Sequence, residues 1–371
     1  MAKHIYCHIP FCAAKCPYCD FYSESGRDNS VIQDVFSAMR DELRSLENPD
    51  RVETIYIGGG TPSFVNSRLI CFLLDTIRET NSVRPGAEIT IEVNPSSMSY
   101  DKAVEYRDAG INRVSAGIQS LHDDHLKTLG RLHDAKGAEE CLRDIRKAGI
   151  ENISADLIIA LPGQTTDDVV EDLNKLAELG VKHISTYSLS IEKGTPFYRR
   201  YSDNIEDLVP PEKEREMYHA VRDELVKLGF IPYEISNSCL PGYESRHNSS
   251  YWEGEEYFGI GAGAHGYIDG RRYMHVNDIG QYIKDPLGTD TEEILDDESK
   301  MREYPFLKLR TTEGMNLDEF KRRFSADAEE IFGDAIKANI QKGLLIKEDG
   351  FLRLTRSGID WSNKVFEDFL C

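Results

Sequence analysis

Residues 5–21 read IYCHIPFCAAKCPYCDF, and the spacing of the cysteines in this stretch is the most informative feature of the chain. An apolar, β-branched run at His4–Ile9 comes first, and Cys12, Cys16 and Cys19 follow it in one short loop. Three thiolates in one loop can hold three irons of a cubane cluster and leave the fourth iron without a protein ligand. The pattern therefore predicts one [4Fe–4S] cluster held by three cysteines, directly after the first strand.

A zinc site is the alternative use of the same three cysteines. Structural zinc is bound by a closed tetrahedral set, for which His8 or Asp20 would supply the fourth ligand. Zinc sites usually pair two CxxC-type hooks, whereas this sequence contains one. Four of the eight cysteines lie between positions 7 and 19, and in a long chain such clustering indicates metal chemistry rather than disulfides.

Outward from the cysteine loop, short β-branched or apolar runs alternate with helical patterns through the first 190 residues. The runs that predict strands are His4–Ile9, Thr54–Ile57, Ile89–Val93, Arg113–Gly117, Ile153–Ile159 and His183–Leu189. The helical patterns between them lie near 31–43, 68–79, 101–108, 136–148 and 167–179. Alternating βα units imply an α/β fold with a parallel sheet, and six of them predict a barrel or partial barrel.

Polar or glycine-rich residues follow these runs rather than precede them. The runs end in Pro10–Cys19, Gly58–Thr61, Glu92–Asn94, Gln119, Asp156–Gly163 and Ser188–Glu192. Because the carboxyl ends of barrel strands share one face, we expect these residues to converge on one barrel mouth. Each of them alone is equally consistent with an ordinary polar turn.

The composition argues against several classes of partner. With 65 acidic against 44 basic residues, the 371-residue chain carries a net charge of −21, which repels nucleic-acid backbones and anionic lipid surfaces. No stretch reaches 18 apolar residues, and the N-terminus lacks the pattern of a secretory signal. We therefore expect a cytoplasmic protein with no transmembrane segment and no nucleic-acid partner.

The second half of the chain has a different pattern. Pro210–Pro211 opens a predicted helix that reaches about Leu228, with proline well placed in the first turn. Residues 238–290 are rich in Gly, Tyr and His, which predicts loops and short strands rather than a helix. From about residue 297 the pattern becomes helical again.

The C-terminal end is typical of a small α+β domain. Helices near 316–324 and 327–342 precede two strands around an Asp349–Gly350 turn, an order that resembles a winged-helix domain. Winged-helix domains often bind DNA, and Lys321–Arg323 is a small basic patch, but the overall negative charge favours a lid or docking role. The predicted division of the chain is 1–237 for the barrel, 238–294 for a connecting segment and 295–371 for this domain.

The cysteine loop resembles that of the radical S-adenosylmethionine (SAM) superfamily, whose cluster binds the amino and carboxylate groups of SAM. This resemblance implies a partial (β/α)6 barrel of the TIM type, a three-cysteine [4Fe–4S] cluster and SAM as cofactors. The segment Ile57-Gly58-Gly59-Gly60-Thr61-Pro62 is similar to the superfamily's glycine motif, which implies that Gly59, Gly60 and Thr61 lie beside SAM. Only glycine leaves room for a close backbone approach.

Within the superfamily, nearly the whole chain is similar to the group of oxygen-independent coproporphyrinogen III oxidases. The resemblance implies that Glu92 and Asp156 accept hydrogen bonds from ribose hydroxyls or the ammonium group of SAM, and that Arg131 holds its carboxylate. The residues that match the group's SAM contacts are Tyr6, Tyr18, Glu92, Gln119, Arg131 and Asp156.

Two details resemble the haem chaperones of this group rather than its oxidases. The oxidases have CxxxCxxCxC, whereas position 21 here is Phe, and His247-Asn248-Ser249-Ser250-Tyr251-Trp252 matches the HNxxYW motif of the chaperones. The resemblance implies haem binding, in which His247 is a candidate axial ligand and Tyr251 and Trp252 would stack on the porphyrin. A structural hydrogen bond is the alternative role of His247, and His265 is a second candidate ligand.

The implied function is therefore a chaperone that holds haem and transfers it to apo-haem acceptor proteins, with a reductant such as flavodoxin or ferredoxin as a further partner. Whether such a protein acts as an enzyme stays open, because the catalytic residues are not identifiable. The alternatives are an oxygen-independent coproporphyrinogen III oxidase, against which Phe21 argues, a radical SAM enzyme that modifies haem, and a DNA-binding redox sensor.

Overall fold

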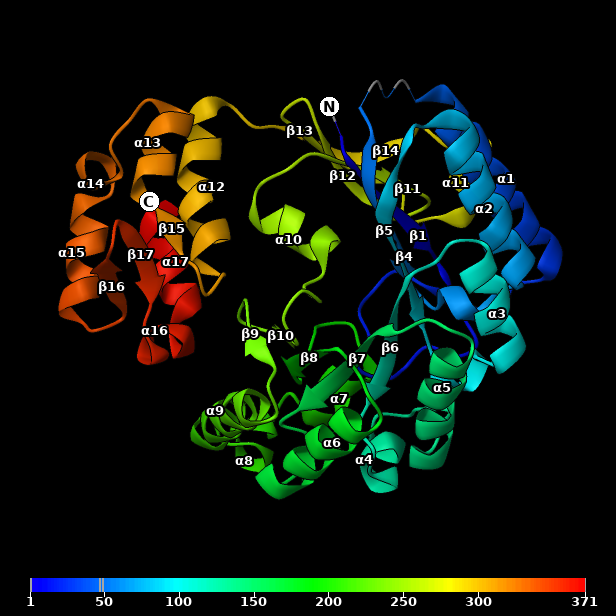
Figure 1. The fold of residues 1–371 in the computed structure, drawn as a ribbon, viewed down its shortest axis with the longest axis horizontal. Coiled ribbons are helices and arrows are strands. Elements are labelled where there is room, and N and C mark those ends of the chain that lie inside the picture. Colours follow the sequence, from blue (N-terminus) through cyan, green and yellow to red (C-terminus); the bar gives the residue numbers. More distant parts are fainter. Residues whose placement is uncertain (1, 47, 49, 371) are drawn as a thin grey trace.

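The computed structural model describes residues 2–370 except positions 47 and 49, and its N-terminal part is built on parallel strands (Figure 1). Each strand pairs in parallel with the next strand of the series. Across the sheet they are β1 (His4–Ile9), β4 (Val52–Gly59), β5 (Val83–Val93), β6 (Arg113–Gln119), β7 (Asn152–Ile159) and β8 (His183–Ser188). The six predicted strands and their parallel order are confirmed.

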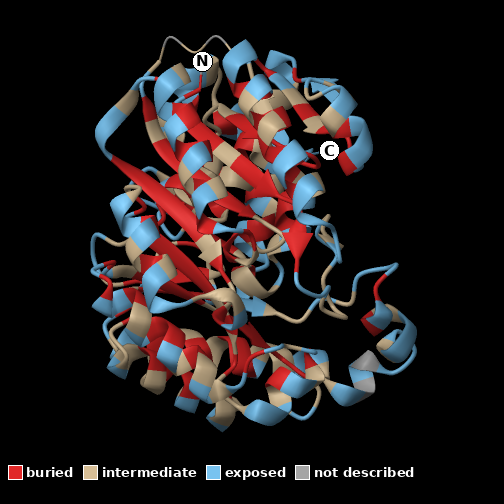
Figure 2. Ribbon diagram, turned by 90° about the vertical axis from the view of Figure 1, so that its right-hand side faces the viewer, coloured by how far each residue is buried: buried red, intermediate tan, exposed pale blue. Residues whose placement is uncertain are grey.

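Helices cover the outside of this sheet and leave its strands buried (Figure 2). In α1, Val35, Met39 and Leu43 lie on one face and are fully buried, as the 3.6-residue period requires. A capping box between Thr165 and Asp168 fixes the start of α6. The covering helices are α1 (Asn29–Ser45), α2 (Ser67–Thr80), α3 (Tyr100–Asp108), α5 (Ala135–Lys147) and α6 (Thr166–Glu178), close to the predicted ranges.

The barrel is incomplete because β1 and β8 do not pair with each other. On its free side β1 pairs with β11 (Tyr257–Ile260), which continues through β12 (His265–Ile268), β13 (Arg271–His275) and β14 (Thr289–Ile294). At the other side β8 pairs with β10 (Asn237–Cys239), and β10 pairs with β9 (Ile231–Pro232). The predicted partial barrel is therefore the centre of a twelve-stranded open sheet.

Residues 297–370 form a smaller unit with a hydrophobic core of its own, around Tyr304, Phe320, Phe332 and Phe366. Its β15, β17 and β16 make a three-stranded sheet, and Asp349 and Gly350 turn the β16–β17 hairpin with positive φ angles, as predicted. The elements are α12 (Asp297–Leu309), β15 (Met315–Asn316), α13 (Leu317–Phe324), α14 (Ala328–Ile331), α15 (Gly333–Gln341), β16 (Leu345–Glu348), β17 (Phe351–Leu354), α16 (Arg356–Asp360) and α17 (Ser362–Leu370).

Two predicted elements of the C-terminal half need correction. The helix predicted over 327–342 is broken at Phe332, whose backbone leaves the helical conformation between α14 and α15. Residues 238–290, predicted without helices, contain α10 (Arg246–Trp252) and α11 (Ile279–Lys284). The motif HNSSYW thus lies on a helix.

A tertiary contact explains why α10 forms. The carboxylate of Glu88 on β5 accepts hydrogen bonds from the backbone N–H groups of Arg246 and His247 at 3.1 and 3.0 Å. Ser245 caps the same end by accepting from the N–H of Asn248. A negative charge at a helix N-terminus stabilises the helix, and this charge comes from a distant strand.

Among the described residues before position 230, the remaining α-helices are α4 (Asp123–Thr128), α7 (Pro196–Tyr201), α8 (Ile205–Leu208) and α9 (Pro211–Lys227), the last as predicted. Among the helices of the described residues, none combines the length and the hydrophobicity needed to cross a bilayer.

Candidate functional site

The three cysteines of the opening motif lie on one loop beside the carboxyl ends of β1 and β4. Cys12 ends the short strand β2 (Phe11–Cys12), its Sγ atom lies 3.3 Å from Thr61 Oγ1, and the N–H of Cys19 donates to the carbonyl of Cys16. All three thiols are free. Burial, followed by the nearby thiols of Cys16 and Cys12, raises the pKa of Cys19.

These observations fit a cationic iron cluster, because positive charge among the three sulfurs would offset the repulsion between neighbouring thiolates. In residues 2–370, apart from positions 47 and 49, no three His, Cys, Asp or Glu side chains are arranged around one point as for a single metal ion. Ligation by Cys12, Cys16 and Cys19 therefore stays a prediction.

A cavity of about 470 Å³ opens at the mouth of the barrel, next to the cysteine loop. The convergence expected at the strand ends is found here, because strands β4 to β8 all contribute to its wall. The predicted SAM residues that line it are Tyr18, Gly59, Gly60, Thr61, Glu92, Gln119, Arg131 and Asp156.

Sequence reasoning missed several residues of the same wall, among them Tyr56, Arg113, Ser115 and Ser185. Side chains of a strand alternate between its two faces, so residues two positions apart share a face. Ser115 and Gly117 are such a pair, and alternation counted back from the strand ends would have identified Tyr56 and Ser115. It would not have distinguished them from ordinary interior residues of a barrel.

Two carboxyl groups lie in this cavity. Glu92 accepts hydrogen bonds from the hydroxyl of Tyr56 at 2.9 Å and from the N–H of Gly59 at 3.1 Å. Asp156 accepts from Ser115 Oγ at 3.1 Å. Burial raises the pKa of Glu92 to about 7, with a smaller contribution from the charge of Asp156, and burial also raises the pKa of Asp156. A cationic or hydroxyl-bearing ligand would offset these burial costs.

The pKa of Glu92 predicts a pH dependence of stability in the cofactor-free protein. Because folding raises this pKa from 4.5 to about 7, the neutral form stabilises the fold, and that stability is lost as the pH rises from about 5 to about 8. We expect wild type and Glu92→Gln to have similar free energies of unfolding near pH 5. Near pH 8 wild type should be less stable than the variant by up to about 3 kcal/mol. Urea titrations at both pH values measure the difference, and parallel pH profiles would contradict it.

The glycine segment after β4 packs against the cysteine loop itself. Gly59 has a φ of 112°, and a Cβ atom there would lie 2.8 Å from the imidazole of His8. A Cβ at Gly60 would lie 2.8 Å from the carbonyl oxygen of Phe11. The N–H groups of Gly60 and Thr61 donate to the carbonyls of Ile9 and Phe11. Glycine is thus required at these two positions so that the cysteine loop can pack closely against them, independently of any ligand in the barrel cavity.

Arg131 joins the cysteine loop to the far wall of the cavity. Its Nη2 donates to the carbonyl of Gly117 at 2.8 Å, and its Nη1 lies 3.6 Å from Cys16 Sγ and 3.4 Å from the hydroxyl of Tyr18. Gln119, beside it, has a φ of 69° and interrupts the register between β6 and β7. The guanidinium is therefore already oriented toward the cysteine side of the cavity.

Tyr6 lies outside this cavity wall. Its hydroxyl donates to His8 Nδ1 at 2.9 Å, because His8 Nε2 donates to the carbonyl of Tyr22, and its ring stacks on Tyr56 at 6.2 Å between centroids. Tyr6 thus contacts the residue that holds Glu92, and its predicted contact with SAM stays a prediction.

His247, Tyr251 and Trp252 lie on α10 and do not line the barrel cavity, although their neighbour Asn248 does. His247 is buried, its Nδ1 lies 2.6 Å from Thr54 Oγ1, and its Nε2 lies 2.9 Å from the hydroxyl of Tyr251. Burial, followed by the neighbouring His4, holds the pKa of His247 well below its usual value. Both ring nitrogens are thus engaged, so ligation of haem by His247 would require one of these hydrogen bonds to break.

Two parts of the chain match known families. Residues 6–176 match the Radical SAM superfamily, and residues 295–361 match the HemN C-terminal domain. In three dimensions the chain is similar to coproporphyrinogen III oxidase (HemN) from Escherichia coli, a radical SAM enzyme, with a TM-score of 0.86. The similarity covers 99% of this chain and 89% of that one at 21% identity, and it shows the shared fold alone.

The sequence is also similar, over nearly its full length, to proteins named heme chaperone HemW. The protein from Lactococcus lactis subsp. lactis (strain IL1403) is 38% identical, covering 98% of this chain and 96% of the relative. That from Bacillus subtilis (strain 168) is 36% identical, covering 99% of each. That from Escherichia coli (strain K12) is 30% identical, covering 99% of this chain and 97% of the relative.

Proposed function

We propose, since this chain belongs to the HemW haem chaperone family of the radical SAM superfamily, that it binds haem and passes it to acceptor proteins. The observation that carries the proposal is the full-length similarity, which includes both the barrel and the C-terminal unit. Phe21, where the oxidases have a fourth cysteine, supports it over radical decarboxylation of coproporphyrinogen.

Family membership implies a [4Fe–4S] cluster and SAM as cofactors. We infer that Cys12, Cys16 and Cys19 hold the cluster, which when reduced would supply an electron to SAM. Glu92 and Asp156 would then accept hydrogen bonds from the ribose or ammonium of SAM, and Arg131 would pair with its carboxylate. The remaining proposed SAM contacts are Tyr6, Tyr18, Gly59, Gly60, Thr61 and Gln119.

The partners follow from the same proposal. Apo-haem proteins would receive the haem, and a flavodoxin or ferredoxin would supply electrons to the cluster. We propose a cytoplasmic protein without a nucleic-acid partner, which agrees with the net charge of −21. We also propose units at 1–237, 238–294 and 295–371, of which the second adds β11 to β14 to the sheet of the first.

Haem binding and haem transfer test the proposed function together. We expect anaerobically reconstituted protein to bind about one equivalent of haem in an absorbance titration, and to lose it to apomyoglobin as a test acceptor. Coproporphyrinogen III, incubated with SAM and a reductant in parallel, should remain unchanged. Protein that binds no haem, or that decarboxylates coproporphyrinogen with SAM, would overturn the proposal.

A further inference from the structure

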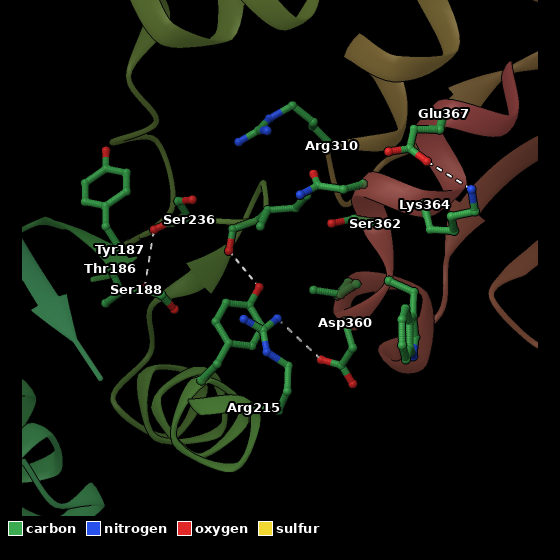
Figure 3. Close-up of a pocket in the computed structure, with 15 residues that line it drawn as sticks. Thr186, Tyr187, Ser188, Arg215, Ser236, Arg310, Asp360, Ser362, Lys364 and Glu367 are labelled. Atoms are coloured by element: carbon green, nitrogen blue, oxygen red, sulfur yellow. Dashed lines mark hydrogen bonds and ion pairs between the residues drawn. The ribbon is translucent and has the colours of Figure 1, made fainter. Parts of the chain in front are cut away.

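A second cavity, of about 520 Å³, lies between the barrel and the C-terminal unit (Figure 3). The end of β8 and the helix α9 form one side, and α16 and α17 form the other. Tyr187 and Ser188 line this cavity and also the barrel cavity, so the two cavities adjoin at the carboxyl end of β8.

Three cationic side chains from three different elements line the cavity: Arg215 on α9, Arg310 at the end of α12, and Lys364 on α17 (Figure 3). Arg215 lies 3.9 Å from Asp360, and Lys364 lies 3.0 Å from Glu367. Asp360 and Glu367 line the same cavity, so the cations of its lining outnumber the carboxylates by one, and in a chain with a net charge of −21 this local excess favours an anion.

Of the three cations, Arg310 has the most N–H donors that are not used in hydrogen bonds within the described part of the chain. Its nearest carboxylate, the buried Glu234, lies 3.7 Å away, beyond direct hydrogen-bond distance, and among the described residues its Nε has no hydrogen-bond partner. The side chain is 24% exposed. A guanidinium presents donors in a planar fork that matches a carboxylate, and the Nε donor of this fork has no acceptor among the described residues.

Trp252 of the HNSSYW segment orients this guanidinium. The guanidinium carbon of Arg310 lies 4.5 Å from the centroid of the indole ring. The next residue, Glu253, pairs with Lys308 on α12 at 2.7 Å. The end of α10 thus fixes the position of α12 through the indole and this ion pair.

The cavity also has apolar, aromatic surface. Tyr187 is 44% exposed and Trp361 is 63% exposed, and both line it. Exposed indole and phenol rings beside convergent cations are suited to a flat, apolar ligand that carries acidic groups at its edge. A porphyrin with propionate groups has this chemistry.

We propose that this cavity between the barrel and the C-terminal unit is the subsite for the porphyrin carboxylates, in which Arg310, positioned by Trp252, pairs with a propionate. The inference rests on the proposed function, because it concerns how the same haem is held. It assigns Trp252 a positioning role on the carboxylate side of the site, in place of stacking on the porphyrin.

The test compares ligands with and without free carboxylates. Wild type, Arg310→Gln and Lys364→Gln are titrated with haem, metal-free protoporphyrin IX and haem dimethyl ester. Lys347→Gln serves as the control, since Lys347 is an exposed lysine of β16 that pairs with Glu329. Arg310→Gln should weaken haem and protoporphyrin about tenfold, because a charge-assisted hydrogen bond is lost, and leave the ester unchanged. Lys364→Gln should have a smaller effect of the same kind.

The positioning role of Trp252 is tested by comparing an aliphatic with an aromatic substitution. Trp252→Leu should weaken haem but not the ester, and Trp252→Phe should restore most of the affinity, because a phenyl ring still attracts the guanidinium. Wild type that binds haem and ester equally, or variants that lose both alike, would overturn the subsite while leaving the proposed function intact. Wild type that binds no porphyrin would overturn both. If Arg310→Gln does not fold, Lys364→Gln and Trp252→Leu decide the question.

Discussion

Replacing Cys12, Cys16 and Cys19 together with serine is expected to reduce iron and sulfide content to background and to abolish the broad visible absorption of the cluster. Serine hydroxyls are poor ligands for iron, and even changes outside the ligand set cost about 10- to 100-fold in metal affinity. The decisive measurement is the iron, sulfide and zinc content of anaerobically reconstituted protein.

The matched control for this experiment is Cys71→Ser. Cys71 is a free, partly exposed cysteine on α2, outside the proposed ligand set, so its loss should leave the iron content unchanged. One equivalent of zinc in place of iron would support the alternative zinc site. Full iron content in the triple variant would refute ligation by these cysteines. Haem titration of the same variant then shows whether haem binding depends on the cluster.

Replacing His247 with alanine is expected to lower the free energy of unfolding by about 3 kcal/mol while the stoichiometry of haem binding is unchanged. The substitution opens a cavity in a fully buried position and leaves the hydroxyl of Tyr251 without its imidazole partner, while the hydroxyl of Thr54 keeps His4 as a partner at 2.8 Å. Each buried group left unsatisfied costs about 1–3 kcal/mol, to which the lost packing adds.

Urea unfolding and the absorption spectrum of the haem complex separate the two roles predicted for His247. His265→Ala is the control, since His265 is the second candidate ligand and is exposed on β12, so its removal should cost little stability. A shifted haem spectrum in His247→Ala, with stability close to that of wild type, would identify His247 as a haem ligand. A spectrum that changes only in His265→Ala would assign that role to His265.

The sequence predicted the fold well where short-range patterns carry the information. The apolar or β-branched runs and the period-3.6 patterns placed β1, β4 to β8 and the covering helices, although β5 begins at Val83 rather than at Ile89. The hairpin at Asp349–Gly350 was found because its turn needs residues that tolerate positive φ angles. The break at Phe332 was missed although Gly333, a poor helix former, follows it directly.

The candidate site was predictable only in part. The strand-end rule brought Glu92, Gln119 and Asp156 to one cavity, because the carboxyl ends of parallel strands share a face. The rule could not identify Tyr56 or Ser115, which precede the strand ends and contact the carboxylates through the side-chain alternation of the barrel interior.

The βα order and the cysteine loop follow from the sequence, because each depends on residues near one another in the chain. The role of the HNSSYW segment depends instead on long-range packing. The N-terminus of its helix donates hydrogen bonds to Glu88, which lies 159 residues from His247 in the sequence. The indole of Trp252, at the other end of the helix, lies against the guanidinium of Arg310. Contacts across such distances leave no periodic trace in the sequence, because they depend on how β5, α10 and α12 pack together. The same packing creates the cavity that we propose for the porphyrin carboxylates.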